Sequence, residues 1–226
     1  LGPLVQQAEL LAAQYDAVVA NPPYMGSGGM NALVKKLAKS QFPDAKSDLF
    51  ACFIERGYTL TSDRGRSSMV TIQNWMFLSS FQKMRERMLQ TRTITTMAQI
   101  GYNSFPSMNS KVAQATVFSL LNCRAGNVVG TYVDLNSAPQ SADKRAVFLD
   151  RNQANCFEVA AGEFQKVPGS PLAYWLSARM RDAFEVGSPL REISRARRGL
   201  ETGDNERFLR LWFELDFGTV SAEETE

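Results

Sequence analysis

The sequence predicts an α/β fold built on an open, mainly parallel sheet, and three observations lead to this prediction. Short apolar runs that suit buried strands alternate with segments whose apolar residues recur at helical spacing. Hydrophobic residues make up 44% and charged residues 21% of the 226 residues, as is typical of a globular protein. The first predicted strand, Tyr15 to Ala20, stops at Asn21-Pro22-Pro23-Tyr24, because proline cannot donate to a sheet. Ligands of such sheets bind outside the carboxyl ends of the strands, where this motif lies.

The same patterns place the remaining elements in order along the chain. Helices are expected over residues 3–14, 32–40, 47–61, 77–90 and 172–185. Strands are expected over residues 15–20, 67–73, 93–100, 113–121 and 128–135, and the first of them suits burial on both faces. Ser47 or Asp48 can cap the third helix, and Asp63-Arg64-Gly65 predicts a turn. The three glycines between Met25 and Asn31 indicate a loop after the motif.

The character of the sequence changes after Gly162, which predicts a domain boundary. Pro168 and Pro171 precede the last predicted helix, and a basic, glycine-punctuated segment follows from Arg191 to Arg210. We therefore expect residues 1–165 to belong to one α/β domain. Residues 166–226 are expected to form a connecting helix and the beginning of a second domain.

Composition excludes several kinds of chemistry. The sequence has no histidine, so a Ser-His-Asp triad, a Cys-His dyad and a histidine-bound metal are excluded. Three cysteines that are far apart (Cys52, Cys123 and Cys156) predict buried, reduced thiols of a cytoplasmic protein rather than a metal site. No apolar run approaches the roughly 18 residues that cross a bilayer, so no membrane span is expected.

Charge alone does not indicate a partner. The net charge of +2 is too small to imply nucleic acid, and clusters of lysine or arginine are more often solvated surface than a binding site. One such cluster comes early in the chain and the other late: Lys35, Lys36, Lys39 and Lys46, then Arg191, Arg195, Arg197, Arg198, Arg207 and Arg210.

The Asn-Pro-Pro-Tyr motif carries the most specific chemical signal. An aromatic amino group such as that of adenine is a poor nucleophile, because its lone pair is delocalised into the ring. Two acceptors at one point, the side-chain oxygen of Asn21 and the backbone carbonyl of Pro22, would bind both N–H groups and favour a tetrahedral nitrogen. Pro22 and Pro23 fix the angle of that carbonyl, and Tyr24 offers a ring on which a flipped base can stack. The alternative is an ordinary Pro-Pro turn in which Tyr24 covers the core.

The chain resembles the N6-adenine DNA methyltransferases, most closely the large enzymes of BREX phage-defence systems. The resemblance rests on runs that cover nearly the whole chain: residues 21–31, Ser47-Asp-Leu-Phe50, Ile54-Glu-Arg56, Trp75 to Ser80, the loop around Phe105-Pro106, Pro168-Gly-Ser-Pro171, and Gly199 to Trp212. It implies part of a Rossmann-like, S-adenosylmethionine-dependent methyltransferase sheet, followed by the start of a target-recognition domain.

The resemblance also implies roles for individual residues. Asn21, Pro22, Pro23 and Tyr24 would be catalytic, with Tyr24 and Phe105 binding the target base. Leu49 and Phe53 would line the S-adenosylmethionine pocket, although helical spacing is equally typical of core residues. At the entrance to the recognition domain, four residues would contact double-stranded DNA: Arg197, Arg198, Thr202 and Asn205.

The glycine-rich cofactor loop of this family should precede Asn21 by many residues, and the twenty upstream residues contain no such loop. We therefore expect an inactive fragment of an enzyme that acts in phage defence or restriction-modification, with other defence subunits as possible partners. Its first strand should lie exposed at a sheet edge, where the fragment would self-associate or pair with a partner. Two other functions stay open, namely an amino methyltransferase acting on protein glutamine or RNA, and a non-catalytic module that binds DNA or a partner.

Overall fold

The structure is a computed structural model that describes residues 2–102, 114–126, 128–139, 142–150 and 155–194. The chain divides into two compact units, residues 1–187 and residues 188–226. Only residues 188–194 of the second unit are described, and they contain the single-turn helix α8 (Leu190–Ile193). The domain boundary predicted after residue 165 stays a prediction. The assignment of residues 166–226 to the entrance of a recognition domain stays a prediction.

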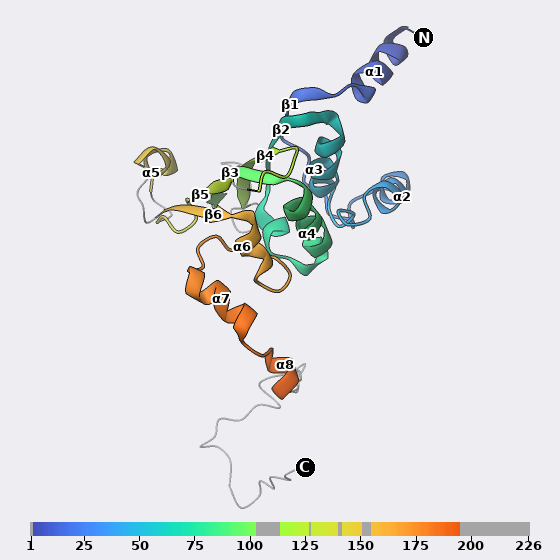
Figure 1. Cartoon of the computed structure of the whole chain (residues 1–226). Helices are drawn as coiled ribbons and strands as arrows, with labels where there is room; N and C mark the ends of the chain where they lie inside the picture. The colour runs from blue at the N-terminus through green and yellow to red at the C-terminus, as the bar shows by residue number, and fades with distance from the viewer. Residues whose placement is uncertain (1, 103–113, 127, 140–141, 151–154, 195–226) are drawn as a thin grey trace, which may run out of the picture. The chain divides into compact units, whose positions relative to one another are not determined.

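A six-stranded sheet forms the centre of the first unit (Figure 1). Its strands lie in the order β1 (Tyr15–Ala20), β2 (Thr61–Ile72), β4 (Ala115–Leu121), β3 (Thr93–Gly101), β5 (Val129–Asp134) and β6 (Cys156–Ala160). The pairs β1–β2 and β3–β5 are parallel, whereas β2–β4, β3–β4 and β5–β6 are antiparallel. The sheet is therefore mixed rather than mainly parallel as predicted, because β4 runs back between β2 and β3. The carboxyl ends of β1, β2, β3 and β5 still share one edge of the sheet.

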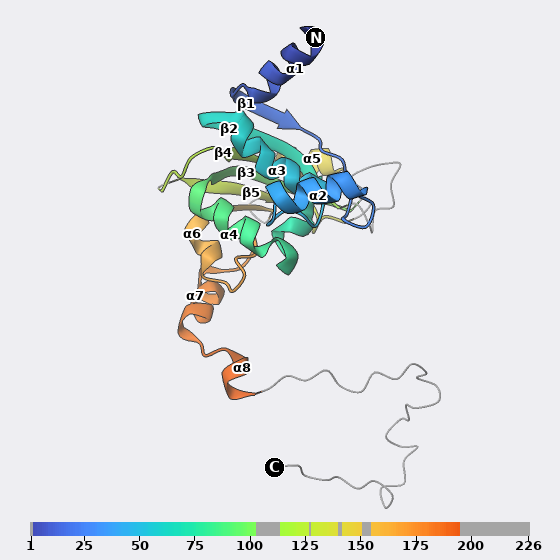
Figure 2. The same ribbon diagram turned by 90° about the vertical axis from the view of Figure 1, so that its right-hand side faces the viewer.

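One face of this sheet carries the core. Helices α3 (Leu49–Leu60), α4 (Gln82–Thr91) and α6 (Ala161–Gln165) bury apolar side chains against it, and α3 and α4 are seen in front of it in Figure 2. Met69, Phe118 and Tyr132 point into this layer and are almost fully buried. The opposite face is more open, and α5 (Lys144–Asp150) reaches it through Phe148, which shares a cavity with residues of β2, β3, β4 and β5.

Several predicted elements differ from the observed ones for local reasons. The helix predicted over residues 77–90 begins only as the 3₁₀ turn η2 (Ser79–Phe81), which leads into α4, and a second 3₁₀ turn, η1 (Gln73–Met76), precedes it. The turn predicted at residues 63–65 lies within β2 as a bulge, with Arg64 at φ 60°. The helix predicted over residues 172–185 begins only at α7 (Ala178–Val186), where Ser177 accepts a hydrogen bond from the Met180 N–H. The residues before it enter the core without helical structure, and Leu172 and Tyr174 are buried there.

Strand β1 is not buried on both faces, as its apolar sequence had suggested. It pairs with β2 on one side, and Val19 is 80% exposed. The preceding helix α1 (Gly2–Ala12) has no buried residue in the described structure. The prediction that this strand occupies an edge of the sheet is therefore confirmed by the strand order.

The core contains a buried cation that joins three segments. Arg85, on α4, is only 1% exposed. Its guanidinium donates hydrogen bonds to the backbone carbonyls of Trp75 at 2.8 Å, Leu78, Gly169 at 2.8 Å and Ser170 at 3.2 Å. Burial lowers the pKa of Arg85, while the adjacent carbonyls satisfy its donors. The arginine thus holds η1 and the loop at residues 168–171 against α4.

Replacing Arg85 with methionine is expected to destabilise the chain strongly. Each buried carbonyl left without a partner costs about 1–3 kcal/mol, so the total loss should reach at least about 3 kcal/mol. In urea unfolding, this loss of stability would appear as a lower urea concentration at the midpoint of the transition. Lys83→Met, an exposed position on the same helix, is the matched control and should leave the midpoint nearly unchanged. Equal midpoints for the two variants would contradict a stabilising role for Arg85.

Candidate functional site

The Asn-Pro-Pro-Tyr motif leaves β1 at the shared carboxyl edge of the sheet. Asn21 and Pro23 are exposed, Pro22 is buried and Tyr24 is half-buried. The Tyr24 hydroxyl donates to the side-chain oxygen of Asn21 over 3.4 Å. The Tyr24 ring meets the Phe50 ring edge-on, with centroids 6.3 Å apart and planes at 85°. Burial raises the pKa of Tyr24, which keeps the hydroxyl protonated and able to donate.

The residues that follow the motif are fastened to the start of α3 by Asp48. One carboxylate oxygen of Asp48 accepts hydrogen bonds from the backbone N–H of Met25 at 3.0 Å and of Phe50 at 3.4 Å. The Leu49 N–H donates to the Met25 carbonyl at 3.0 Å, and Gly26 forms a β-bridge with Asp48. Burial raises the pKa of Asp48, and the backbone N–H groups oppose that rise by stabilising the carboxylate. Asp48 thus both caps α3, as one of the two predicted candidates, and fixes the exit of the motif.

A mostly apolar cavity of about 420 Å³ lies between α2 (Ala32–Gln41) and α3. Leu49 and Phe53, the two residues expected to bind a cofactor, both line it, and Phe53 is 40% exposed. The other lining residues come from both helices and the link between them: Val34, Leu37, Ala38, Gln41, Phe42, Cys52 and Arg56. Burial, followed by the charge of Glu55, raises the pKa of the Cys52 thiol to about 11, so it remains a protonated wall residue.

The remaining predicted site residues lie outside the described residues. These are Phe105, Arg197, Arg198, Thr202 and Asn205. The sequence reasoning also missed a set of polar side chains at the same sheet edge: Gln73, Gln99, Gln114, Asn136 and Lys144. The one available signal was that three glutamines fall at predicted strand ends.

The strand order and the position of the motif after β1 define the class: part of a Rossmann-like methyltransferase domain. Residues 5–105 match the family described as Eco57I restriction-modification methylase. A type I restriction-modification methyltransferase subunit from Streptococcus thermophilus shares the fold, with a TM-score of 0.51 at 16% identity over 72% of this chain and 38% of that one.

Two curated relatives match nearly the whole chain. It is 39% identical over 222 residues to the adenine-specific methyltransferase BrxX of Escherichia coli O9:H4 (strain HS), which covers 97% of the chain. It is 37% identical over 223 residues to the adenine-specific methyltransferase PglX of Lacticaseibacillus casei (strain Zhang), which covers 96%. The chain spans 18% of the length of each relative. Among the described residues, no helix is long and apolar enough to cross a membrane.

Proposed function

We propose that the full-length protein transfers a methyl group from S-adenosylmethionine to N6 of an adenine flipped out of DNA, and that this chain supplies the amino-group site. The observation that carries the proposal is the rigid Asn-Pro-Pro-Tyr turn at the carboxyl edge of the sheet, with Asn21 exposed and its neighbour Pro22 buried. The relatives, named adenine-specific methyltransferases, support adenine as the target. The proposed role in phage defence rests on the similarity to the same two relatives.

The proposed chemistry needs two acceptors for one amino group. The side-chain oxygen of Asn21 and the carbonyl of Pro22 serve as these acceptors, and both belong to a turn that Asp48 fixes from the other side. Tyr24 donates to the Asn21 oxygen and so fixes the orientation of the amide, and the second lone pair of that oxygen would accept from N6. The electron pair of N6 then becomes available for attack on the methyl donor.

The cavity beside α3 fits one part of the cofactor. Its apolar lining, with Phe53 and Leu49, suits the face of an adenine ring, and its volume lies within the usual range of ligand sites, roughly 300–1,000 Å³. The lining residues include no acidic side chain that could bind a ribose hydroxyl. Leu49 and Phe53 would therefore hold the adenine end, and S-adenosylmethionine supplies the methyl group when bound.

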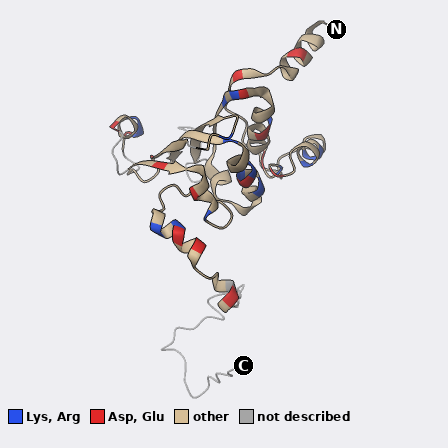
Figure 3. Ribbon diagram, viewed as in Figure 1, with Lys and Arg blue, Asp and Glu red and all other residues tan. Residues whose placement is uncertain are grey.

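DNA as the partner is supported by the helix that follows the motif. Helix α2 contains Lys35, Lys36 and Lys39 and no acidic residue, and Figure 3 shows its basic colour. The three lysines line an open depression with Ala32 and Ser40. Such a surface suits phosphate contacts, which position DNA without reading its sequence. Arg197, Arg198, Thr202 and Asn205 are proposed as separate DNA-contacting residues, and Phe105 as a residue that binds the target base.

The test is methyl transfer by the full-length protein. Incubation with tritiated S-adenosylmethionine and DNA, followed by nucleoside analysis, should give labelled N6-methyladenine. Label in cytosine, RNA or protein, with none in adenine, would overturn the proposal.

Replacing Tyr24 with alanine is expected to weaken capture of the flipped base more than overall DNA affinity. Stacking on an aromatic ring contributes about 1–3 kcal/mol per base, whereas affinity for duplex DNA comes mainly from phosphates. A 2-aminopurine at the target position would report the loss as reduced fluorescence on binding. Tyr24→Phe retains the ring and removes only the donor to Asn21, so it should preserve the signal. An unchanged signal in Tyr24→Ala would remove Tyr24 from the base pocket.

A further inference from the structure

The cavity between α2 and α3 is completed by the link that joins these two helices, residues 42–48. Phe42, the first residue of this link, lines the cavity together with Leu49 and Phe53 from α3. The Phe42 N–H donates to the Ala38 carbonyl at 3.0 Å, so Phe42 is the point at which α2 passes into the link. The shape of the cavity therefore depends on where the link lies.

Two contacts fasten the link to α3. Ala45 is wholly buried, and its N–H donates to the Phe42 carbonyl at 3.0 Å, which turns the chain at this point. The Cys52 thiol, on α3, donates to the Ala45 carbonyl at 3.5 Å. Both contacts lie within residues 42–52, so they fix the link only relative to the start of α3.

A third contact with the link comes from α4. Arg87 Nη1, on that helix, lies 3.2 Å from the carboxylate of Asp44 in the link. The other terminal nitrogen of Arg87, Nη2, donates to the carboxylate of Glu55 on α3. One guanidinium thus bridges the link and α3. It is placed by a helix of which no described residue lines the cavity.

The burial of Glu55 fixes the guanidinium of Arg87. The Glu55 side chain is 7% exposed, whereas that of Arg87 is 47% exposed. Burial raises the pKa of Glu55, and the charge and hydrogen bond of Arg87 oppose that rise. An exposed ion pair contributes little to stability, but a buried carboxylate that loses its cation is costly. The pair with Glu55 therefore holds Arg87 in place, with Nη1 presented to Asp44.

The contacts of Arg87 lie outside the cavity itself. Glu55 follows Phe53 by two residues on α3, so the two side chains point to different faces of that helix. Asp44 follows Phe42 by two residues in the link and is not among the residues that line the cavity. Arg87 thus contacts neither the cavity nor its lining side chains, and it acts on the two segments that form the walls.

We propose that Arg87 is a positioning residue for cofactor binding. Through Asp44 and Glu55 it fixes the α2–α3 link and α3 relative to each other, and so sets the width of the cavity. The inference rests on the proposed function, in which this cavity holds the adenine end of S-adenosylmethionine. A wall that is fixed before binding needs no ordering when the cofactor enters, so Arg87 strengthens cofactor binding without touching the cofactor.

The test is Arg87→Met in the full-length protein, with cofactor binding measured in two ways. Calorimetry with S-adenosylhomocysteine gives a Kd in the absence of DNA, and methyl transfer gives KM and kcat for S-adenosylmethionine. Both Kd and KM are expected to rise roughly three- to tenfold, the usual cost of ordering one side chain on binding. At saturating cofactor, kcat should stay near the wild-type value, because only uniform binding is lost. Unchanged Kd and KM would overturn the proposal.

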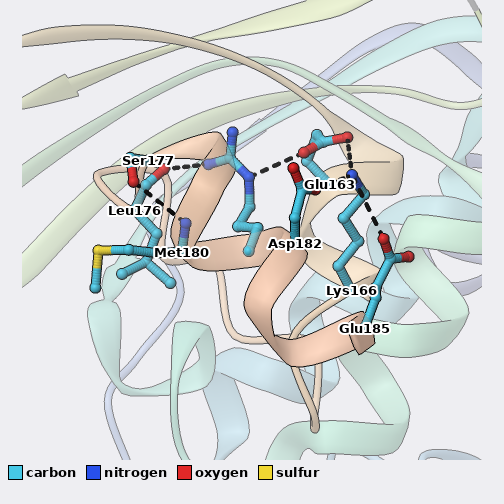
Figure 4. A network of polar contacts seen from close by, with 8 residues as sticks. Glu163, Lys166, Leu176, Ser177, Met180, Asp182 and Glu185 are labelled. Carbon is cyan, nitrogen blue, oxygen red and sulfur yellow. Dashed lines mark hydrogen bonds and ion pairs between the residues drawn. The ribbon is translucent and has the colours of Figure 1, made fainter. Parts of the chain in front are cut away.

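Arg181→Met is the matched control for a general loss of stability. Arg181 is a buried arginine whose Nε lies 3.0 Å from Glu163. The same network includes Lys166, 2.8 Å from Asp182, and ties α6 to α7 (Figure 4). Within the described structure, neither helix contributes to the cavity lining, so this change should lower thermal stability and leave Kd and KM at the wild-type level. An equal rise in both variants would overturn the proposal and assign Arg87 a merely structural role.

Asp44→Asn supplies a second test, which spares the buried carboxylate. It weakens the contact with the link and leaves Arg87 paired with Glu55, so this variant should fold even if Arg87→Met does not. A rise in Kd and KM similar to that of Arg87→Met is expected, and the double variant should show no further rise. Wild-type values for Asp44→Asn would overturn the proposal. A wild-type protein that does not bind S-adenosylhomocysteine would contradict the proposed function instead, so the two failures are distinguishable.

Discussion

Replacing Asn21 with alanine in the full-length protein is expected to abolish adenine methylation while DNA binding survives. The side-chain oxygen of Asn21 accepts from the reacting nitrogen itself, so its loss removes an interaction that strengthens toward the transition state. Removing one such preorganised group lowers kcat by roughly 100- to 1,000-fold in comparable sites. Affinity for DNA comes mainly from phosphate contacts, none of which Asn21 supplies in the proposed arrangement.

The measurement is tritium transfer under single-turnover conditions, paired with a gel-shift assay of DNA affinity. Asn31→Ala is the matched control, since it removes the same amide ten residues later. Asn31 caps α2 by accepting from the Val34 N–H at 2.9 Å, so this change should cost only about 1 kcal/mol of stability and spare most of the activity. Substantial methylation by Asn21→Ala would refute the assignment of Asn21 as an acceptor for N6.

The position of the motif was predictable because its signals are local. Two prolines after an apolar run end a strand whatever its neighbours are, and Asp48 can cap a helix from its own sequence context. Leu49 and Phe53 are four residues apart, so they lie on the same face of α3 and line the same cavity. These parts of the site needed no knowledge of which strands pair.

The hydrogen bonds among the three glutamines at the sheet edge were not predictable, because they depend on pairing between distant strands. Gln73, Gln99 and Gln114 meet only because β4 returns between β2 and β3, and a sequence does not state that register. Tyr174 was expected within a helix, yet it enters the core ahead of α7, where packing against Tyr132 outweighs its local preference. The bulge in β2 was not predictable either. Asp63-Arg64-Gly65 has the composition of a turn, and only the pairing of β1 with β2 shows that these residues lie within a strand.

The exposed edge formed by β1 leads to the other prediction with a large effect. Strand β1 pairs with β2 on one side, and its far side presents backbone groups that are ready to pair with another chain. Its one charge, Asp16, is engaged by the Ser62 hydroxyl at 2.9 Å, and Val19 is 80% exposed. Charged or proline residues usually discourage such pairing, but β1 contains one charged residue and no proline.

The 226-residue chain studied alone is therefore expected to self-associate through β1. Val19→Lys should shift it toward the monomer, because a lysine on an edge strand would have to be buried against another strand when two chains pair. Leu149→Lys, at a 66% exposed position on α5, adds the same charge away from the edge and should leave association unchanged. Light scattering after size-exclusion chromatography at several concentrations measures both variants. A wild-type chain that stays monomeric at tens of micromolar would show that β1 is protected from pairing. Equal masses for the two variants would show that the contact between chains does not involve β1.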